Sequence, residues 1–426
     1  MRAKLFLAAL AGVALASCVT DKEYVETNPS QDAKIVFDSP VLYNNSQTRA
    51  NVFGEVGTHQ YGPVTYSYPK EELFKIFGIQ YTGSFEGWAA EGVAPAEFNG
   101  QAIAYDKDVD GWAPKKIVDG KADYYHWPIG KNMAFAAYSP ADLNVNITDG
   151  YTSDVNSAVV PTYGANGLTI NDFTVIPNPA YQYDLLFSQR AVDMGADDMT
   201  HGASYYSGIP IQFQHALTSI RFSLQNTSNA EVVIKEIKLY GVKSTGDFSE
   251  GITEGTDPSA YNRGEGGNVN PTWSGHDNVV TKEKAYNVFY INGGVDAAGG
   301  VVAPYEAQYL SVLLDKTLDP TNTNTGTFHQ LLLLPQAITA DAKVEVTYTI
   351  NGSKNVKEVK LADALKVNPD PGKADETLNE TLSEWKMGTR YTYRLWYSEE
   401  SASKDRIYFS PSTDNWQDAG AYKIEL

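Results

Sequence analysis

Few residues of this 426-residue chain combine the types and spacings that chemistry requires. The chain has one cysteine, which excludes an internal disulfide and a cysteine-rich zinc site. No H-E-x-x-H motif and no i, i+4 histidine pair occurs, so the six histidines form no metal-binding helix face. A G-x-S-x-G nucleophile motif and a phosphate loop with its lysine are also missing. The sequence therefore predicts a protein that is not an enzyme and that needs no metal or cofactor.

One acidic stretch comes close to a metal site. Residues Asp106 to Gly111 have the D-x-D-x-D-G pattern of the first six positions of a calcium loop. The twelfth position falls on Ile117, where an EF-hand has a bidentate glutamate, and no amphipathic helices flank the stretch. We interpret it as an acidic turn between two strands, and the sequence leaves open whether this turn binds calcium.

The single cysteine stands where a specific modification is expected. Arg2 and Lys4 precede an apolar run, Leu5–Leu15, which is too short to span a bilayer as a helix but is typical of a secretory signal. The motif L-A-S-C, ending at Cys18, resembles the lipobox of bacterial lipoproteins, in which the thiol takes a diacylglycerol. We expect residues 1–17 to be a signal peptide and Cys18 to be lipidated. The alternative is a chance free cysteine after an ordinary signal peptide.

The charge of the chain bears on its location and partners. Val19 follows the cysteine in place of the aspartate that retains lipoproteins at the inner membrane of enteric bacteria, which favours the outer membrane. With 52 acidic against 33 basic residues the formal net charge is −19, and no lysine or arginine cluster offsets it. Phosphate backbones would repel such a chain, so nucleic acid is excluded as a partner.

After a polar tether, residues 34–43 form a strand-like stretch with one apolar face, made up of Ile35, Phe37, Val41 and Tyr43. The next residues, 44–50, are polar and contain Arg49 and Ala50. We expect an exposed loop here, of the kind that proteases cut most readily.

Beyond Asn51, short β-type runs alternate with Gly, Pro, Asn and Asp, a pattern that predicts β-sandwiches. Helices are expected to be few and short, with residues 69–77 and 361–366 as the best candidates, and the first of these overlaps a β-type run over residues 73–81. A stretch of small and polar residues around 194–208 suggests a domain boundary. The predicted divisions are the signal peptide 1–17, a lipidated propeptide 18–49, an N-terminal domain 50–207 and a C-terminal domain 208–426.

Five short segments follow one another along the chain: Tyr124–Pro128, Met133–Pro140, Phe213–Phe222, Leu331–Gln336 and Gly388–Tyr393. In this order they resemble segments of the fimbrillin family, the lipoprotein pilins of type V pili. The resemblance implies an all-β chain with two consecutive transthyretin-like β-sandwich domains. It also implies a structural role in a fimbrium, other pilin subunits as partners, and a location at the outer membrane and cell surface.

In such pilins a lipidated precursor reaches the surface and an Arg-specific protease cuts it in a loop after the first strand, here between Arg49 and Ala50. The freed groove then accepts a strand from another subunit. The residues supply a physical reason, because loss of the apolar face of residues 34–43 would expose an apolar slot lined by unpaired backbone groups. A strand from another chain could refill this slot by β-augmentation.

The C-terminus offers a donor segment. Tyr422, Ile424 and Leu426 alternate with polar residues to the end of the chain, as a strand with one apolar face requires. The pattern fits equally well an ordinary terminal strand that pairs within its own domain.

Other functions stay open on the sequence. A tip pilin or an anchor pilin is one alternative, although Arg49 argues against an anchor. A solitary surface lipoprotein that binds glycan is another, because the 28 tyrosines and 7 tryptophans could line a sugar groove. Cleavage after Arg49 would release such a protein from its lipid. The sequence does not say whether the chain has a host glycan or protein receptor.

Overall fold

The computed structural model describes the following residues, and the account below concerns these alone. They are 34–37, 41–42, 70, 72–82, 98–128, 131–144, 155–164, 167–179, 182–188, 190–194, 209, 211–226, 228–251, 270–290, 301–302, 307–310, 331–363, 365–367, 377–397, 407–409, 417–418 and 421–425.

The described residues lie almost entirely in strands and the turns between them, which confirms the prediction of an all-β fold. Helical segments are short 3-10 turns such as η4 (Lys282–Lys284) and η6 (Leu361–Asp363). None of the described helical segments is long and apolar enough to cross a membrane.

The first sandwich consists of two sheets. A seven-stranded sheet has the order β1-β13-β11-β8-β2-β3, with β12 beside β8, and a four-stranded sheet has the order β17-β16-β10-β9. Phe187 of β11 packs on Phe248 of β16 with ring centroids 5.0 Å apart, so the two sheets face each other. The strands are β1 (Val41–Leu42), β2 (Phe74–Tyr81), β3 (Phe98–Ile103), β8 (Asn132–Ser139), β9 (Thr162–Gly164), β10 (Gly167–Thr174), β11 (Leu186–Ser188), β12 (Ala191–Met194), β13 (Gln212–His215), β16 (Lys243–Ser249) and β17 (Thr272–Val279).

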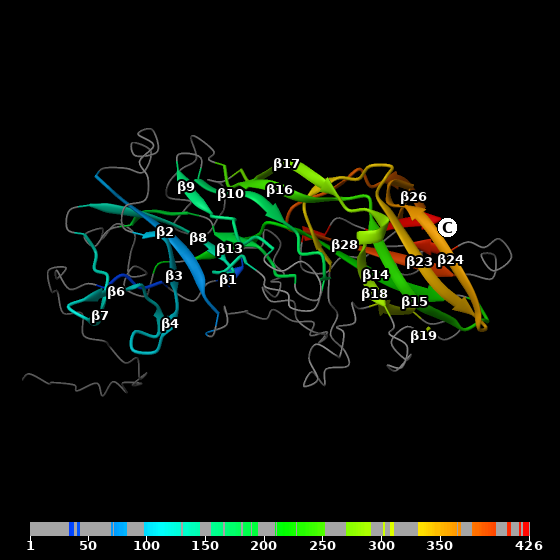
Figure 1. Cartoon of the computed structure of the whole chain (residues 1–426), viewed down its shortest axis with the longest axis horizontal. Coiled ribbons are helices and arrows are strands. Elements are labelled where there is room, and N and C mark those ends of the chain that lie inside the picture. The colour runs from blue at the N-terminus through cyan, green and yellow to red at the C-terminus, as the bar shows by residue number, and fades with distance from the viewer. Residues whose placement is uncertain are drawn as a thin grey trace, which may run out of the picture.

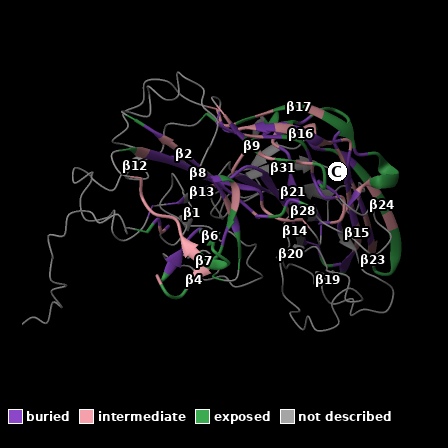
Figure 2. Cartoon of the chain, turned by 60° about the vertical axis from the view of Figure 1, so that its left-hand side comes forward, coloured by how far each residue is buried: buried purple, intermediate pink, exposed green. Residues whose placement is uncertain are grey.

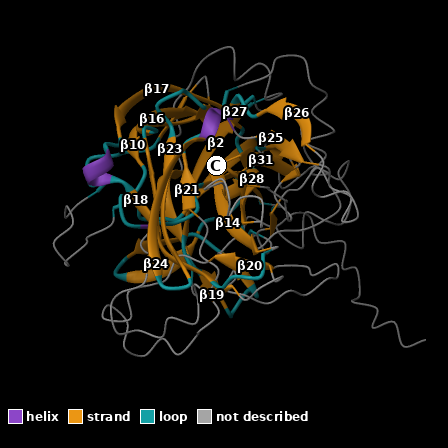
Figure 3. Ribbon diagram, turned by 90° about the vertical axis from the view of Figure 1, so that its right-hand side faces the viewer, coloured by secondary structure: helices purple, strands orange, loops and turns teal. Residues whose placement is uncertain are grey.

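The second sandwich also has two sheets, which Figure 3 shows from the C-terminal end of the molecule. A nine-stranded sheet has the order β20-β14-β28-β29-β31-β25-β26, with β21 beside β14 and β30 beside β28. A five-stranded sheet has the order β18-β15-β23-β24, with β19 beside β15. The strands are β14 (Thr218–Asn226), β15 (Val232–Tyr240), β18 (Tyr286–Tyr290), β19 (Val301–Val302), β20 (Ala307–Leu310), β21 (Leu331–Leu333), β23 (Lys343–Ile350), β24 (Ser353–Lys360), β25 (Leu365–Val367), β26 (Thr377–Thr381), β28 (Thr389–Tyr397), β29 (Ile407–Phe409), β30 (Gln417–Asp418) and β31 (Ala421–Glu425).

Two-stranded pairs complete the described strands. They are β4 (Tyr105–Asp106) with β5 (Gly111–Trp112), β6 (Lys115–Val118) with β7 (Lys121–Tyr124), and β22 (Gln336–Ala337) with β27 (Glu384–Trp385).

The molecule is elongated, with the N-terminal strands at one end and the C-terminal strands at the other (Figure 1). Burial follows the strand pattern: those side chains of β13, β14 and β28 whose burial is described are mostly buried, whereas β24 and the hairpin β6–β7 carry many exposed residues (Figure 2). Strands β13, β16 and β17 all follow residue 207 in the chain and yet lie in sheets of the first sandwich. The division of the chain after residue 207 stays a prediction.

One local expectation is wrong. The sequence offers a helix over residues 69–77 and an overlapping β-type run over residues 73–81, and Phe74–Tyr81 is strand β2, hydrogen bonded between β3 and β8. A strand at the centre of a sheet can bury both faces, and its apolar residues then do not alternate. Periodicity alone cannot distinguish such a run from a buried helix. The other helix candidate, 361–366, is helical only in the 3-10 turn η6, and strand β25 begins at Leu365.

Candidate functional site

The segment Lys34–Phe37 is held by backbone hydrogen bonds on one side. The amide of Ile35 donates to the carbonyl oxygen of Tyr125 at 2.8 Å. Phe37 and Trp112 exchange two bonds, from the amide of Phe37 at 2.8 Å and from that of Trp112 at 3.1 Å. This side of the segment is therefore bound to the chain around β5 and β7.

The same stretch of chain is also bound on its other side. The amide of Ile209 donates to the carbonyl oxygen of Val36 at 2.8 Å. A few residues later, β1 pairs in parallel with β13, with Val41 opposite Gln212. The described residues of the predicted first strand, 34–37 and 41–42, thus belong to the first sandwich.

Two side chains of this segment, those of Ile35 and Phe37, lie in the core. Ile35 is 1% exposed and Phe37 is fully buried. The ring of Phe37 makes an edge contact with that of Phe135, with centroids 5.2 Å apart, and another with that of Phe74 at 6.4 Å. Full burial of an apolar side chain of this size contributes roughly 1.5–3 kcal/mol. Removal of the segment would therefore leave an apolar slot whose backbone edges had lost their partners.

Gly111 explains how the segment comes so close to β5. A β-carbon on Gly111 would lie 2.9 Å from the carbonyl oxygen of Phe37 and 2.7 Å from a methyl group of Val36. Any larger residue would push the two backbones apart, so the glycine that ends the acidic turn also permits the Phe37–Trp112 ladder.

The acidic turn from Asp106 to Gly111 connects β4 and β5. The Asp106 carboxylate lies 2.6 Å from Nζ of Lys115 and accepts a hydrogen bond from the Tyr124 hydroxyl at 2.7 Å. Although burial opposes it, the hydrogen bonds from Lys115, Tyr124 and the Asp108 amide lower the pKa of Asp106 to about 2. This carboxylate is thus engaged by a cation of the chain itself. Among the described residues no group of three or more His, Cys, Asp or Glu side chains could hold a metal ion.

The C-terminal segment lies in the nine-stranded sheet of its own chain. Strand β31 pairs antiparallel with β25, where Tyr422 is opposite Lys366, and with β29, where Ile424 is opposite Phe409. This pairing is the one expected of an ordinary terminal strand, the alternative to a donor segment. It places Tyr422 and Ile424 in the second sandwich, whereas the slot that loss of the first strand would leave lies in the first sandwich. Five other predicted site residues lie outside the described part of the chain: Cys18, Tyr43, Arg49, Ala50 and Leu426.

Sequence reasoning missed the residues that bind the first strand, namely Trp112, Tyr125 and Ile209. The run that begins at Ile209 reads as a strand, but its parallel partner lies about 170 residues earlier in the chain, and periodicity carries no information on such pairings.

Comparison with known proteins assigns the chain to one protein family. A family model described as fimbrillin-like matches residues 89–416, well over half of the chain. No curated protein matches the chain.

Solved structures that match this chain include a protein of Bacteroides uniformis described as a putative cell adhesion protein. It has 13% identity, a TM-score of 0.36, and coverage of 84% of this chain and 91% of that one. A second protein of the same description, from Bacteroides ovatus, has 12% identity, a TM-score of 0.37, and coverage of 93% and 98%. The tip fimbrial protein Mfa3 of Porphyromonas gingivalis has 8% identity, a TM-score of 0.24, and coverage of 77% and 90%.

Proposed function

The chain belongs to the fimbrillin-like family, and from that premise we propose that it is a structural pilin subunit of a type V pilus that serves adhesion at the cell surface. It is exported with the signal peptide 1–17, lipidated at Cys18 and held at the outer membrane. An Arg-specific protease then cuts between Arg49 and Ala50, and the subunits polymerise by donor-strand exchange.

The burial of Ile35 and Phe37 supports this proposal most directly. Ile35 and Phe37 precede the proposed cut and belong to the core of the first sandwich. Cleavage at Arg49 would separate them from the rest of the subunit. Each backbone group left buried without a partner costs about 1–3 kcal/mol, so an incoming strand that pairs with the vacated edge would be strongly favoured.

The donor in this proposal is the segment that ends with Tyr422, Ile424 and Leu426. Five residues span only about 17 Å, so the chain from about Trp416 contributes as well. Because β31 pairs with β25 and β29 in its own sheet, assembly must exchange one set of strand pairings for another. The proposal therefore requires the vacated slot to bind this segment more tightly than its own sheet does.

The cleavage step is tested with Arg49→Ala in the full-length precursor, expressed in cells that assemble the pilus. Thr48→Ala, which keeps the arginine, is the matched control. The control should yield a high-mass ladder in surface shear fractions and an N-terminus at Ala50, and Arg49→Ala should yield neither. Assembled wild-type protein that still began at Cys18 would contradict the mechanism and support an anchor pilin or a solitary lipoprotein.

Lipidation is tested by growing cells with labelled palmitate. The wild-type precursor should take up the label and Cys18→Ser should not. Equal labelling of the two proteins would show that Cys18 is not the lipidated residue.

Deletion of residues 422–426 tests the donor assignment. In a chain that is still exported and cut, the deletion should leave a folded subunit that does not polymerise, whereas Lys423→Ala, on the polar side of the alternation, should polymerise. Normal polymers from the truncated chain would refute the assignment. An unfolded product would favour a strand that serves only its own sandwich.

A further inference from the structure

Two residues connect the seven-stranded sheet to the nine-stranded sheet. Strand β13 ends at His215 and β14 begins at Thr218, with only Ala216 and Leu217 between them. Ala216 is fully buried and Leu217 is 2% exposed. Connections between domains are usually exposed and polar, so a buried connection of two residues is not the linker that independent domains have.

The backbone of this connection is hydrogen bonded to three different elements. The Ala216 amide donates to the carbonyl oxygen of Leu185, just before β11, at 2.8 Å. The Ala216 carbonyl oxygen accepts a bond of 2.6 Å from the indole nitrogen of Trp273 in β17. The Leu217 carbonyl oxygen accepts one of 2.9 Å from the amide of Gly388, just before β28. Rotation about the connection would break all three bonds.

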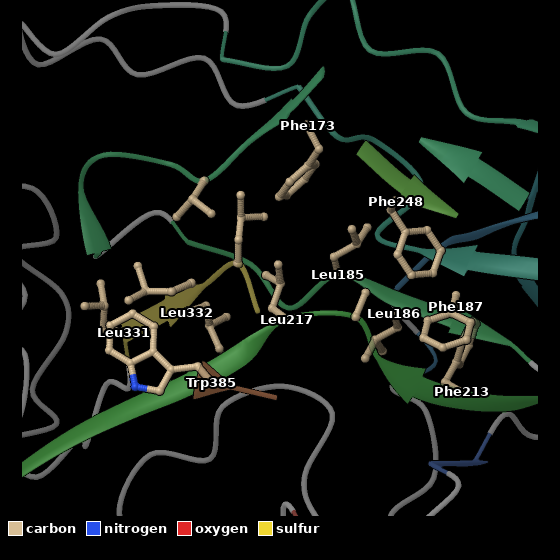
Figure 4. Packing of buried hydrophobic residues seen from close by; sticks show 14 of the residues in the cluster. Phe173, Leu185, Leu186, Phe187, Phe213, Leu217, Phe248, Leu331, Leu332 and Trp385 are labelled. Atoms are coloured by element: carbon tan, nitrogen blue, oxygen red, sulfur yellow. The ribbon is translucent and has the colours of Figure 1, made fainter. Parts of the chain in front are cut away.

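Apolar packing surrounds the connection. In Figure 4, Leu217 lies among side chains from both sandwiches, with Leu185 on one side and Leu332 and Trp385 on the other. One hydrophobic cluster runs through both sandwiches without interruption. A pivot between the sandwiches would expose part of this cluster to water, at a cost of about 25 cal/mol for each Å² of apolar surface.

The two strands on either side of the connection lead to the two regions that take part in the proposed assembly, the edge beside β1 and the sheet that holds β31. Strand β13 pairs with β1, next to the proposed slot. Strand β14 pairs in parallel with β28 from Ser219 opposite Arg390 to Asn226 opposite Tyr397. Strand β28 in turn pairs with β31 at Tyr393 and Tyr422. The stretch 212–226 therefore runs from the first strand to the sheet that holds the C-terminal strand.

We propose that the Ala216–Leu217 connection is a locked joint that makes the two sandwiches one rigid body. The joint holds the edge beside β1 and the sheet of β31 at a fixed distance and angle. Resting on the proposed function, this geometry sets the repeat of the filament, because every subunit presents its slot and its donor segment in the same relation. The rigidity itself does not depend on polymerisation.

Pulsed electron paramagnetic resonance on the full chain tests the joint. Cys18→Ser removes the native thiol, and spin labels are placed at Val160→Cys in the first sandwich and Val356→Cys in the second, both at exposed positions. The matched control pair is Ile117→Cys with Val160→Cys, on the same side of the joint. The distance distribution across the joint should be about as narrow as that of the control pair.

Insertion of two glycines between Ala216 and Leu217 should broaden the distribution across the joint at least twofold and leave the control pair unchanged. Trp273→Phe, which keeps an aromatic ring but removes the indole N–H, should broaden it less, and it provides the test if the insertion does not fold. A broad distribution across the unaltered joint, beside a narrow control, would overturn the proposal. So would an unchanged distribution in both variants. Such a failure would leave the pilin function standing, since the joint is measured on monomers.

Discussion

At the scale of single residues, Phe37 is the most deeply buried of the four residues 34–37 that the structure describes with their side chains in the predicted first strand. Because its ring is fully buried against Phe74 and Phe135, Phe37→Ala should lower the free energy of unfolding of the uncleaved chain by about 3–5 kcal/mol. Urea unfolding measures the effect. Ile117→Ala, at a site that is 74% exposed, is the control and should change stability by about 0.5 kcal/mol or less. A similarly small effect at Phe37 would contradict the packing.

Asp106 gives a prediction about pH. Its pKa in the folded chain, about 2, lies below the ordinary value of 3.8, so its contribution to stability is complete above the ordinary value and is lost as the pH falls toward 2. Asp106→Asn should therefore cost about 1 kcal/mol at pH 7 and almost nothing near pH 2. Unfolding of the two proteins from pH 2 to 7, with Asp119→Asn as control, measures this. A cost independent of pH would contradict the ion pair as its source.

Alternation in the sequence identifies Ile35 and Phe37 as part of the apolar face of the first strand, and the structure describes the side chains of these two residues. The pattern predicts Ile35 and Phe37 on one face, and both are buried. Their displacement during assembly stays a prediction. The partners of the strand were not predictable, because the Trp112 and Ile209 contacts depend on backbone groups, which every residue except proline carries alike.

At the scale of elements, a buried ion pair connects β10, β16 and the start of β12. Nε of Arg190 lies 3.1 Å from a carboxylate oxygen of Glu250, and both side chains are fully buried. The other carboxylate oxygen accepts a hydrogen bond of 2.7 Å from the Leu168 amide. Gly167 makes room for the pair, because a β-carbon there would collide with the guanidinium group.

Glu250→Gln would remove the carboxylate charge that faces the buried guanidinium of Arg190 and should lower the free energy of unfolding by about 3–5 kcal/mol. The double variant Arg190→Met with Glu250→Leu should recover most of this loss, because no buried charge of the pair remains. Urea unfolding of the three proteins provides the comparison. If the double variant were no more stable than the single one, the cost would come from lost hydrogen bonds and shape rather than from an uncompensated charge.

Whether a segment forms a strand was easier to predict from the sequence than which other strand it pairs with. Strand β23 alternates buried and partly exposed residues along its length, as the sequence suggests. Strand β2 does not alternate, and the sequence there is compatible with both a β-type run over residues 73–81 and a helix over residues 69–77. The parallel pairing of β14 with β28 joins residues about 170 positions apart, and nothing in either strand specifies the other. Pairings of this kind are set by the packing of the whole domain.

At the scale of the whole molecule, cleavage would change which strands have partners. In the uncut chain, residues 34–37 are bound between Trp112 and Ile209, and β31 is bound in the second sandwich. After cleavage, the slot would lack a strand, while the proposed donor segment would still be paired in its own sheet. The proposed polymerisation is then an exchange between chains, and its outcome depends on which strand occupies the vacated slot.

A competing peptide should therefore block assembly. We predict that a synthetic peptide of residues 34–43, added in excess to freshly cut subunits, reoccupies the edge beside β13 and lowers the yield of polymer several-fold, because a bound ligand shifts the exchange by mass action. The polymer ladder on a gel, measured against peptide concentration, gives the effect.

A control peptide with Ile35→Ser and Phe37→Ser keeps the backbone groups but loses the two side chains that are buried in the core. It should have little effect, because about 1.5–3 kcal/mol of burial is lost at each position. Equal inhibition by the two peptides, or none by either, would show that the first strand is not what a neighbouring subunit replaces.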